Sequence, residues 1–519
     1  MSEEHRSPSP PEVQSNLSPF ELRFERYRRT AGLLFGPLGF ILLEVFRPAG
    51  LSVACTHLAA VLVWVLVWWI CEAVPLPVTA LLGPVLAVLL GVASVREAMA
   101  PFADPVIFLF LGGFVIAEGM SVHGMDRRIA GWVLGSRWAG AGPLRVTAAF
   151  AVIAAGLSMW LSNSVTTAML YPMAIGVLGA INRRDPGSGL SPAENRTPRF
   201  ANGLLLTCAY AASIGGICTP VGTPPNLIAM GYLANLTSRR IDFFSWMAIC
   251  LPVMGLMLAG MFLIIRILHS PELSRLPAGT VLLTEGSHGA GPWTKGERNV
   301  TVAFGFAVTL WLLPGICALL VGTSHPTYIR LQSILPEGGV AIVAAALLFV
   351  LPVDWNQRRF TLTWAQAARI DWGTLILFGG GLSLGGMMFK TGLAEKIGMA
   401  LVHGSGATSL VALTIVFTTF AVFFTEVVSN TATATMLVPL AISAAQTAGV
   451  SPVEPALGCA LGCSMAFMFP VATPPNAIIY GSGAVRITTM IKTGWWLNLW
   501  ACILISLSVL IMVPLVLGR

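Results

Sequence analysis

Long apolar stretches, separated by short polar segments, run through almost the whole chain. A helix needs about 17–25 apolar residues to cross a bilayer. We expect eleven such spans, at residues 30–47, 52–72, 76–92, 105–122, 200–235, 245–268, 299–320, 338–352, 371–389, 453–482 and 493–517. The pattern therefore predicts an all-α polytopic membrane protein.

Two of these spans, 200–235 and 453–482, are too long for a single crossing and contain Pro-Pro pairs. Because proline removes a hydrogen bond of the helix, each is expected to be a broken helix. Two further apolar regions, 144–180 and 408–447, have polar centres flanked by arms of about half a membrane each. Such segments are typical of re-entrant helical hairpins, because irregular backbone at membrane depth must lie against protein or a water-filled cavity.

The two halves of the chain repeat one another. The hairpin centres Ser-Asn-Ser (162–164) and Ser-Asn-Thr (429–431) lie 267 residues apart. The motif Thr-Pro-Pro-Asn occurs at 223–226 and again at 473–476, an offset of 250. Because five spans separate equivalent positions, the second copy is upside down relative to the first. Inverted repeats of this kind are typical of secondary transporters.

These boundaries divide the chain into a tail, two halves and a linker. We expect a cytoplasmic N-terminal tail (1–29), a first half with inverted repeat 1 (30–268), a cytoplasmic linker (269–298) and a second half with inverted repeat 2 (299–519).

Composition and charge agree with a membrane protein. Hydrophobic residues make up 55% of the chain and charged residues only 10%, whereas a soluble domain carries roughly a quarter charged residues. With the N-terminus inside, the expected cytoplasmic segments hold 22 of the 30 Lys and Arg residues. That asymmetry predicts a multi-pass protein of the inner (plasma) membrane with a cytoplasmic N-terminus and an external C-terminus. The net charge of +7 is thus explained by topology, and we expect no nucleic-acid partner.

The hairpin centres carry the candidate chemistry. Where a helix restarts after each centre, free N–H groups and the positive end of the helix dipole favour an oxyanion. The side chains of Asn163, Ser164, Asn430 and Thr431 add neutral donors. Free carbonyls at the end of the arriving helix suit a hard cation such as Na⁺.

With its two Ser-Asn-Ser/Thr centres, its two Thr-Pro-Pro-Asn breaks and the run Ser-Met-Ala-Phe-Met-Phe-Pro-Val-Ala-Thr-Pro-Pro-Asn (464–476), the chain resembles the divalent anion/sodium symporter family. The resemblance covers roughly residues 30–518. It implies sodium-coupled transport of dicarboxylates, citrate or sulfate, or in some members exchange. It also implies a homodimer in which a transport domain moves against a scaffold domain, the elevator mechanism.

The resemblance also assigns residues to the site. Substrate carboxylates would meet Asn163, Ser164, Asn430 and Thr431, with Thr223, Pro224, Thr473 and Pro474 along the wall. One Na⁺ site would use Ser158, Ser162, Asn163 and Gly222, and a second would use Thr425, Ser429, Asn430 and Ala472.

Two features bear on the substrate and the coupling. The first centre has Ser164 where the family usually has threonine, which leaves size selectivity open. No Arg or Lys lies within the motifs, so bound cations must balance a dianion. We therefore expect Na⁺-coupled uptake of a C4-dicarboxylate such as succinate, malate or fumarate. Dicarboxylate exchange, and sodium-coupled sulfate or citrate transport, remain alternatives.

Other interpretations are weaker. Glu426, beside the second centre, is either a proton or cation ligand or, as we favour, a residue at a water-filled rim, because its counterpart in the first repeat is Met159. Gly-Leu-Ser-Leu-Gly at 381–385 matches a nucleophile-elbow pattern, which would make Ser383 the nucleophile of an intramembrane enzyme. No base is positioned for it, so we expect no enzyme. An ion channel would show flux without saturation.

Overall fold

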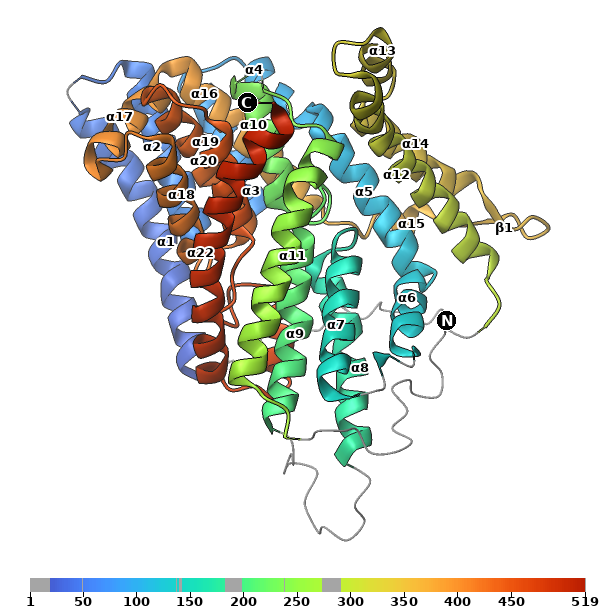
Figure 1. Ribbon diagram of the computed structural model, residues 1–519. Helices are drawn as coiled ribbons and strands as arrows, with labels where there is room; N and C mark the ends of the chain where they lie inside the picture. Colours follow the sequence, from blue (N-terminus) through green and yellow to red (C-terminus); the bar gives the residue numbers. More distant parts are fainter. Residues whose placement is uncertain are drawn as a thin grey trace, which may run out of the picture.

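A computed structural model describes residues 19–48, 50–136, 138–139, 142–182, 198–237, 239–272 and 291–518. The N-terminal tail before residue 19, the loop over 183–197 and most of the expected linker lie outside the described residues. The described chain is helical apart from one two-stranded antiparallel hairpin, β1 (Pro352–Asp354) and β2 (Arg359–Phe360) (Figure 1). The fold is that of an all-α polytopic membrane protein.

The first half consists, in order, of α1 (Pro19–Phe46), α2 (Val53–Cys71), α3 (Leu76–Leu89), α4 (Val95–Met99), the 3₁₀ helix η2 (Ala100–Ala103), α5 (Pro105–Val122), α6 (Met125–Leu134), α7 (Pro143–Ser158), α8 (Asn163–Asn182), α9 (Pro198–Gly216), α10 (Pro224–Thr237) and α11 (Phe243–Leu268). The second half consists of α12 (Lys295–Val321), α13 (Pro326–Ile334), α14 (Glu337–Val350), α15 (Trp364–Ala367), α16 (Trp372–Thr391), α17 (Leu393–Ser405), α18 (Leu410–Phe424), α19 (Asn430–Thr447), α20 (Val453–Cys463), α21 (Pro474–Gly481) and α22 (Ile487–Leu517).

Each of the eleven expected spans corresponds to a helix or to a pair of helices. In the described part of the chain, eight helices are long and apolar enough to cross a membrane, or up to nine if the bent pair α13–α14 counts as one span. Seven of the eight belong to expected spans, and the eighth is α8, the second arm of the first expected hairpin. At 20 residues α8 is long enough to cross the membrane, so the expectation of an arm of half a membrane was wrong for it. The remaining four expected spans are short helices or pairs of helices, among them 200–235 (α9 and α10) and 453–482 (α20 and α21). At the N-terminal end, α1 starts at Pro19, so the charged segment expected to precede the first span is part of the same helix.

Small residues allow the first two helices to pack closely. A methyl group added at Gly36 of α1 would come within 2.7 Å of the Trp68 ring of α2, and one added at Gly32 within 2.5 Å of Cys71 Cβ. Glycine at such positions is typical of helix pairs in membranes, where close backbone approach replaces the hydrophobic effect as the source of attraction.

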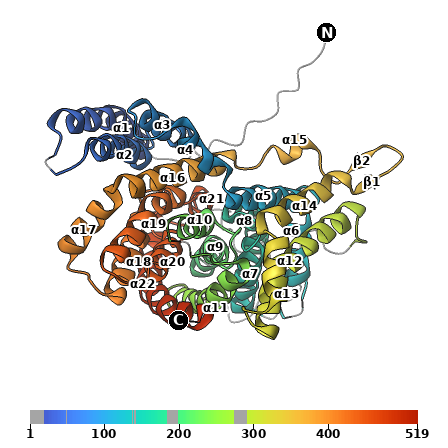
Figure 2. The same cartoon turned by 90° about the horizontal axis from the view of Figure 1, so that it is seen from above.

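The two hairpins lie at opposite levels of the molecule. In Figure 1, α7 and α8 occupy the lower half of the view, and α18 and α19 lie in the upper half. The broken helices form the centre: α9 and α10 lie in the middle of Figure 2, and α9 is buried almost throughout. Each polar tip therefore reaches the buried middle of the protein from its own side.

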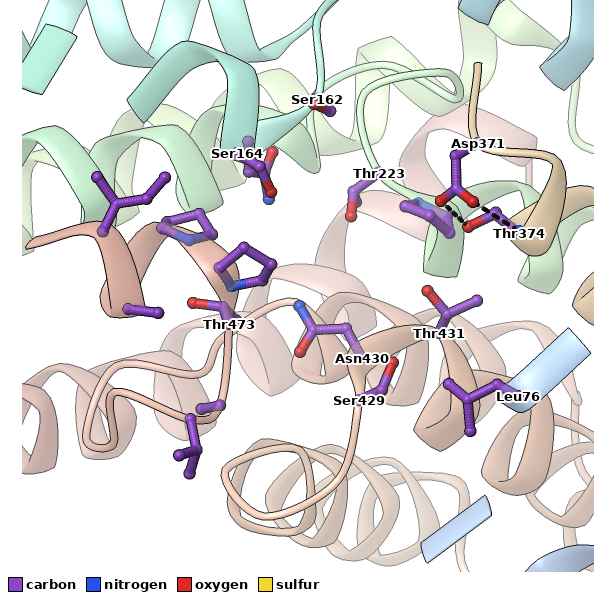
Figure 3. A pocket seen from close by; sticks show the side chains of 18 of the residues that line it. Leu76, Ser162, Ser164, Thr223, Asp371, Thr374, Ser429, Asn430, Thr431 and Thr473 are labelled. Atoms are coloured by element: carbon purple, nitrogen blue, oxygen red, sulfur yellow. Dashed lines mark hydrogen bonds between the residues drawn. The ribbon is translucent and has the colours of Figure 1, made fainter. Parts of the chain in front are cut away.

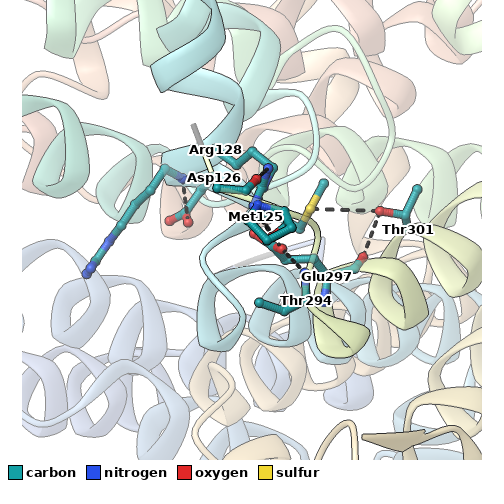
Figure 4. Close-up of polar contacts among 9 residues, drawn as sticks. Met125, Asp126, Arg128, Thr294, Glu297 and Thr301 are labelled. Carbon is teal, nitrogen blue, oxygen red and sulfur yellow. Dashed lines mark hydrogen bonds and ion pairs between the residues drawn. The ribbon is translucent and has the colours of Figure 1, made fainter. Parts of the chain in front are cut away.

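A buried ion pair fixes the start of the second half. The Arg128 guanidinium of α6 donates to both Glu297 carboxylate oxygens, with Nε–Oε1 2.7 Å and Nη2–Oε2 3.1 Å (Figure 4). It also donates to the carbonyl oxygens of Gly291 and Pro292 and lies over the Trp293 ring. Glu297 in turn accepts from the Thr294 amide, completing the capping box that begins α12. The segment before α12 is thus attached to α6.

Candidate functional site

One large cavity, of about 1490 Å³, contains both hairpin tips and both helix breaks. All eight residues expected to meet the substrate line it: Asn163, Ser164, Thr223, Pro224, Asn430, Thr431, Thr473 and Pro474. In Figure 3, Ser164 and Thr223 lie across the space from Asn430, Thr431 and Thr473. The structure thus brings together groups that are 267 residues apart in the chain.

Four helices begin at this cavity. The helices α8 and α19 start at Asn163 and Asn430, and α10 and α21 start at Pro224 and Pro474. The first N–H groups of α8 and α19 have no partner within their helices and carry the positive end of the helix dipole. The helices α10 and α21 begin with two prolines, which have no N–H, so they contribute their dipoles alone. The convergence of these N-termini makes the cavity favourable for an anion without a lysine or arginine at its centre.

A hydroxyl behind each tip fixes the orientation of the tip asparagine. Ser158 Oγ donates to Asn163 Oδ1 at 2.6 Å, and Thr425 Oγ1 donates to Asn430 Oδ1 at 2.7 Å. Ser158 and Thr425 are fully buried and, unlike the asparagines, do not line the cavity. Since each Oδ1 accepts from behind, each amide NH₂ group is the donor left for a substrate carboxylate.

The asparagine that ends each Thr-Pro-Pro-Asn motif donates hydrogen bonds to backbone carbonyls of the break that precedes it. Asn226 Nδ2 donates to the carbonyls of Gly216 and Thr219, at 2.9 and 2.8 Å. Asn476 Nδ2 donates to the carbonyls that lie 250 residues further on, Ala466 and Phe469, at 3.1 and 3.0 Å. The sequence predicted these two motifs but gave their asparagines no role. The signal for that role is that the asparagine and the residues whose carbonyls it contacts all recur 250 residues later.

Carbonyl oxygens converge beside Gly222 in the first break. A methyl group there would come within 2.5 Å of the Gly216 oxygen and 3.0 Å of the oxygens of Ser158 and Met159. Hard cations such as Na⁺ are bound by oxygens of this type. The residues present therefore fit a coupling cation, in the place where the sequence predicts the first Na⁺ site.

The second break differs from the first. Its residue in the place of Gly222 is Ala472, which carries a methyl group, and the break is longer, over 464–473 against 217–223. The Cys463 carbonyl also lies 2.8 Å from Thr425 Oγ1, so it shares the single hydroxyl proton with Asn430 Oδ1. At the tips, Ser162 Oγ accepts from the Val165 amide at 3.3 Å, whereas the Ser429 side chain caps no amide of α19. The two expected cation sites are therefore related but unequal.

Glu426 does not lie at a water-filled rim, and that prediction was wrong. The residue is 2% exposed. Its carboxylate accepts from the amides of Phe467, Met468 and Phe469 and from Asn498 Nδ2. The comparison with Met159 was misleading because the two breaks differ. In the second break the Glu426 carboxylate accepts from three consecutive amides, whereas in the first the Cys218 amide donates to the Gly215 carbonyl.

Charged side chains that sequence reasoning did not assign to the site line one part of the same cavity. Four are arginines and four are acids, so their formal charges cancel: Arg26, Arg28, Arg29, Arg369, Glu25, Glu72, Glu118 and Asp371. Asp371 accepts from the Thr374 amide and hydroxyl at the start of α16 (Figure 3). Residues 25–29 of α1 thus line the cavity that also contains the tips.

Ser383 has a packing contact in this structure. It is 2% exposed, and its hydroxyl donates to the Ala98 carbonyl at 2.7 Å, which ties α16 to α4. This contact occupies the hydroxyl proton that a base would have to remove from a nucleophile.

A helical membrane protein with paired hairpin tips around one central cavity has the architecture of a secondary transporter. The family model of the sodium:sulfate symporter transmembrane region matches residues 33–517. The chain belongs to this family, the divalent anion/sodium symporters that its motifs resemble.

Curated relatives agree with this assignment, and a solved structure agrees with the fold. The chain is 33% identical over 490 residues to the sodium-dependent dicarboxylate transporter SdcS of Staphylococcus saprophyticus, covering 94% of this chain and 92% of the relative. The protein of the same name in Staphylococcus aureus gives the same identity and coverage. The crystal structure of the YdaH transporter of Alcanivorax borkumensis has a similar fold, with a TM-score of 0.53 at 14% identity, over 82% of this chain and 88% of that one.

Proposed function

We propose that this protein carries a C4-dicarboxylate such as succinate into the cell, coupled to Na⁺. The observation that carries the proposal is the pair of tip asparagines, whose amide groups face one cavity while a hydroxyl holds each from behind. The curated relatives named above are sodium-dependent dicarboxylate transporters.

Charge balance supports coupling to a cation. The anion-binding groups of the two motifs are neutral, and the charged groups elsewhere on the cavity cancel. A dianion in a cavity of low dielectric needs positive charge beside it. Carbonyl oxygens beside Gly222 and hydroxyls behind both tips are the groups that would hold Na⁺ there.

Exchange is less well supported than symport. A transporter that exchanges dicarboxylates without a coupling cation has no use for cation-binding oxygens. Here each repeat has one buried hydroxyl that donates to its tip asparagine, Ser158 in the first repeat and Thr425 in the second.

Transport would proceed by an elevator movement in a homodimer of the plasma membrane, with a cytoplasmic N-terminus and an external C-terminus. The cavity is lined by Glu25 and Arg29 at the start of α1, and the C-terminus lies at the opposite end of the molecule (Figure 1). In this orientation the cavity would open towards the cytoplasm. An elevator movement would then carry both tips and both breaks past the remaining helices to the other side.

Uptake of labelled succinate into proteoliposomes tests the proposal. With no internal substrate, an inward Na⁺ gradient should drive saturable accumulation, and an equal K⁺ gradient should not. Uptake that ignores Na⁺ and requires internal dicarboxylate would contradict symport and favour exchange.

A further inference from the structure

We propose that Glu426 is a positioning residue for the second cation site, acting through the backbone of the second break. The inference rests on the proposed sodium coupling and extends it to a residue outside the expected ligand sets. Glu426 follows Thr425 directly, and it lies where the hairpin tip meets the broken helix.

The Glu426 carboxylate binds three consecutive amides. Oε1 accepts from the amides of Phe467 and Met468, at 2.7 and 2.9 Å, and Oε2 accepts from those of Met468 and Phe469, both at 3.1 Å. Asn498 Nδ2 of α22 donates to Oε1 at 2.7 Å. Successive backbone N–H groups around one anion form a nest. Every one of these contacts is made by a donor, which is the environment that a carboxylate anion requires.

Holding these amides also orients carbonyls. In a trans peptide the N–H of one residue and the C=O of the preceding residue point in opposite directions. By fixing the amides of Phe467 and Met468, Glu426 therefore directs the carbonyls of Ala466 and Phe467 away from itself. Those carbonyls accept from Asn476 Nδ2 at 3.1 Å and from the Tyr210 hydroxyl at 2.7 Å.

Ala466 is the counterpart of Gly216, whose carbonyl is one of those beside Gly222 that form the expected first cation site. It lies 250 residues after Gly216. In the first repeat, Gly216 is the last residue of α9, so the helix itself orients its carbonyl. In the second repeat, α20 ends at Cys463, and the Ala466 carbonyl belongs to non-helical chain. That chain needs another support.

The difference between the repeats explains why only one has the acid. In the first repeat the residue in the place of Glu426 is Met159. There the Gly216 carbonyl is already oriented by α9, so no acid is needed. The longer second break leaves three amides unpaired by helix, and Glu426 satisfies them. Outer-shell partners of metal ligands typically change affinity by roughly 10- to 100-fold when they are removed.

Sodium activation of succinate uptake tests the inference. Glu426→Gln should raise the Na⁺ concentration for half-maximal uptake by roughly 10- to 100-fold, because the amide NH₂ group would face backbone donors. The KM for succinate at saturating Na⁺ should stay within about twofold, since the tip side chains are unchanged. The matched control is Glu454→Gln, which alters another buried acid in the first turn of α20, away from the break. A wild-type Na⁺ dependence in Glu426→Gln, or an equal shift in Glu454→Gln, would overturn the proposal.

A double-mutant cycle locates the effect. Thr425→Ala and Glu426→Gln act on one cation site, so their effects on half-saturation should be strongly non-additive. Ser158→Ala acts on the other site, and its effect should multiply with that of Glu426→Gln. Additive effects of Thr425→Ala and Glu426→Gln, together with non-additive effects of Ser158→Ala and Glu426→Gln, would contradict the assignment to the second site.

Two further measurements keep the inference separate from folding and from the proposed function. If Glu426→Gln does not reach the membrane, Asn498→Ala removes one donor and should shift half-saturation severalfold in the same direction; no shift would overturn the proposal. Thermal stabilisation of the purified protein by NaCl against KCl reports Na⁺ binding without transport. Na⁺-independent uptake by wild type would refute sodium coupling, whereas unaltered Na⁺ stabilisation of Glu426→Gln would refute only the role of Glu426.

Discussion

Thr425 donates its hydroxyl proton to Oδ1 of Asn430 across 2.7 Å, from a fully buried position behind the second tip. The contact decides which end of the asparagine amide faces the cavity. An anion site made of neutral groups depends on such fixed orientations, because a rotated amide would present its oxygen to the substrate.

Removing this hydroxyl should impair transport. Thr425→Val keeps the shape of the side chain but removes the one hydroxyl proton that Asn430 Oδ1 and the Cys463 carbonyl share. We expect a loss of roughly tenfold or more in succinate uptake at a fixed Na⁺ concentration, as for a lost buried hydrogen bond. Thr425→Ser retains the hydroxyl and should stay close to wild type. Equal activity of the valine and serine variants would show that the hydroxyl has no role.

A methyl group in the carbonyl cradle should reduce Na⁺ affinity. Gly222→Ala would place Cβ 2.5 Å from the Gly216 carbonyl oxygen, so the cradle must open or the backbone must shift. We expect the Na⁺ concentration for half-maximal uptake to rise by at least about tenfold. Gly156→Ala is the control, because a methyl group there meets nothing within 4 Å. A wild-type Na⁺ response in Gly222→Ala would remove the cradle from the mechanism.

The Arg128–Glu297 pair should matter for stability rather than for transport chemistry. Both side chains are only 4% exposed, and removing one partner of a buried pair typically costs about 3–5 kcal/mol. Arg128→Ala should therefore lower the midpoint of thermal unfolding in detergent markedly. The neighbouring Arg127 is exposed, so Arg127→Ala should leave the midpoint unchanged. Similar midpoints for the two variants would contradict this account of the network in Figure 4.

Acid should destabilise the protein through His269, directly after α11. Burial, aided by the nearby Lys492 charge, lowers the pKa of His269 from 6.5 to about 4. Between these values the unfolded chain binds a proton that the folded protein excludes, so stability falls as the pH drops below 6.5. At pH 5 the loss is roughly 2 kcal/mol. His269→Gln, which can still meet the Thr493 hydroxyl, should show a smaller fall in unfolding midpoint between pH 7.5 and 5. An identical fall in both proteins would contradict the assignment.

Much of the site could be predicted from the sequence, because its elements repeat. The offsets of 267 and 250 identify Asn163 with Asn430 and Thr223 with Thr473, and the structure brings all four to one cavity. Repetition is also where the prediction failed. Glu426 has no counterpart, so symmetry assigned it to a rim, and only the longer second break explains its burial.

The cavity wall shows a second limit. Arg26 and Arg369 reach the cavity through the positions of α1 and of the segment before α16, which apolar periodicity does not specify. The pattern of apolar runs indicates which segments cross the membrane. The packing partners of each helix, however, depend on contacts between segments that are distant in the sequence. The N-terminal boundary was similarly uncertain, because Pro19–Phe46 continues one helix from a charged segment into an apolar one.

Equilibrium binding of labelled succinate to the purified protein tests the central claim most directly. Because linkage is reciprocal, succinate and Na⁺ should each tighten the other's binding by the same factor. Wild type should bind succinate in NaCl and not in KCl, and Asn430→Ala should bind in neither while unfolding at the wild-type temperature. Succinate binding of equal strength in NaCl and KCl, or full binding by Asn430→Ala, would contradict a dianion site built on the tips and completed by Na⁺.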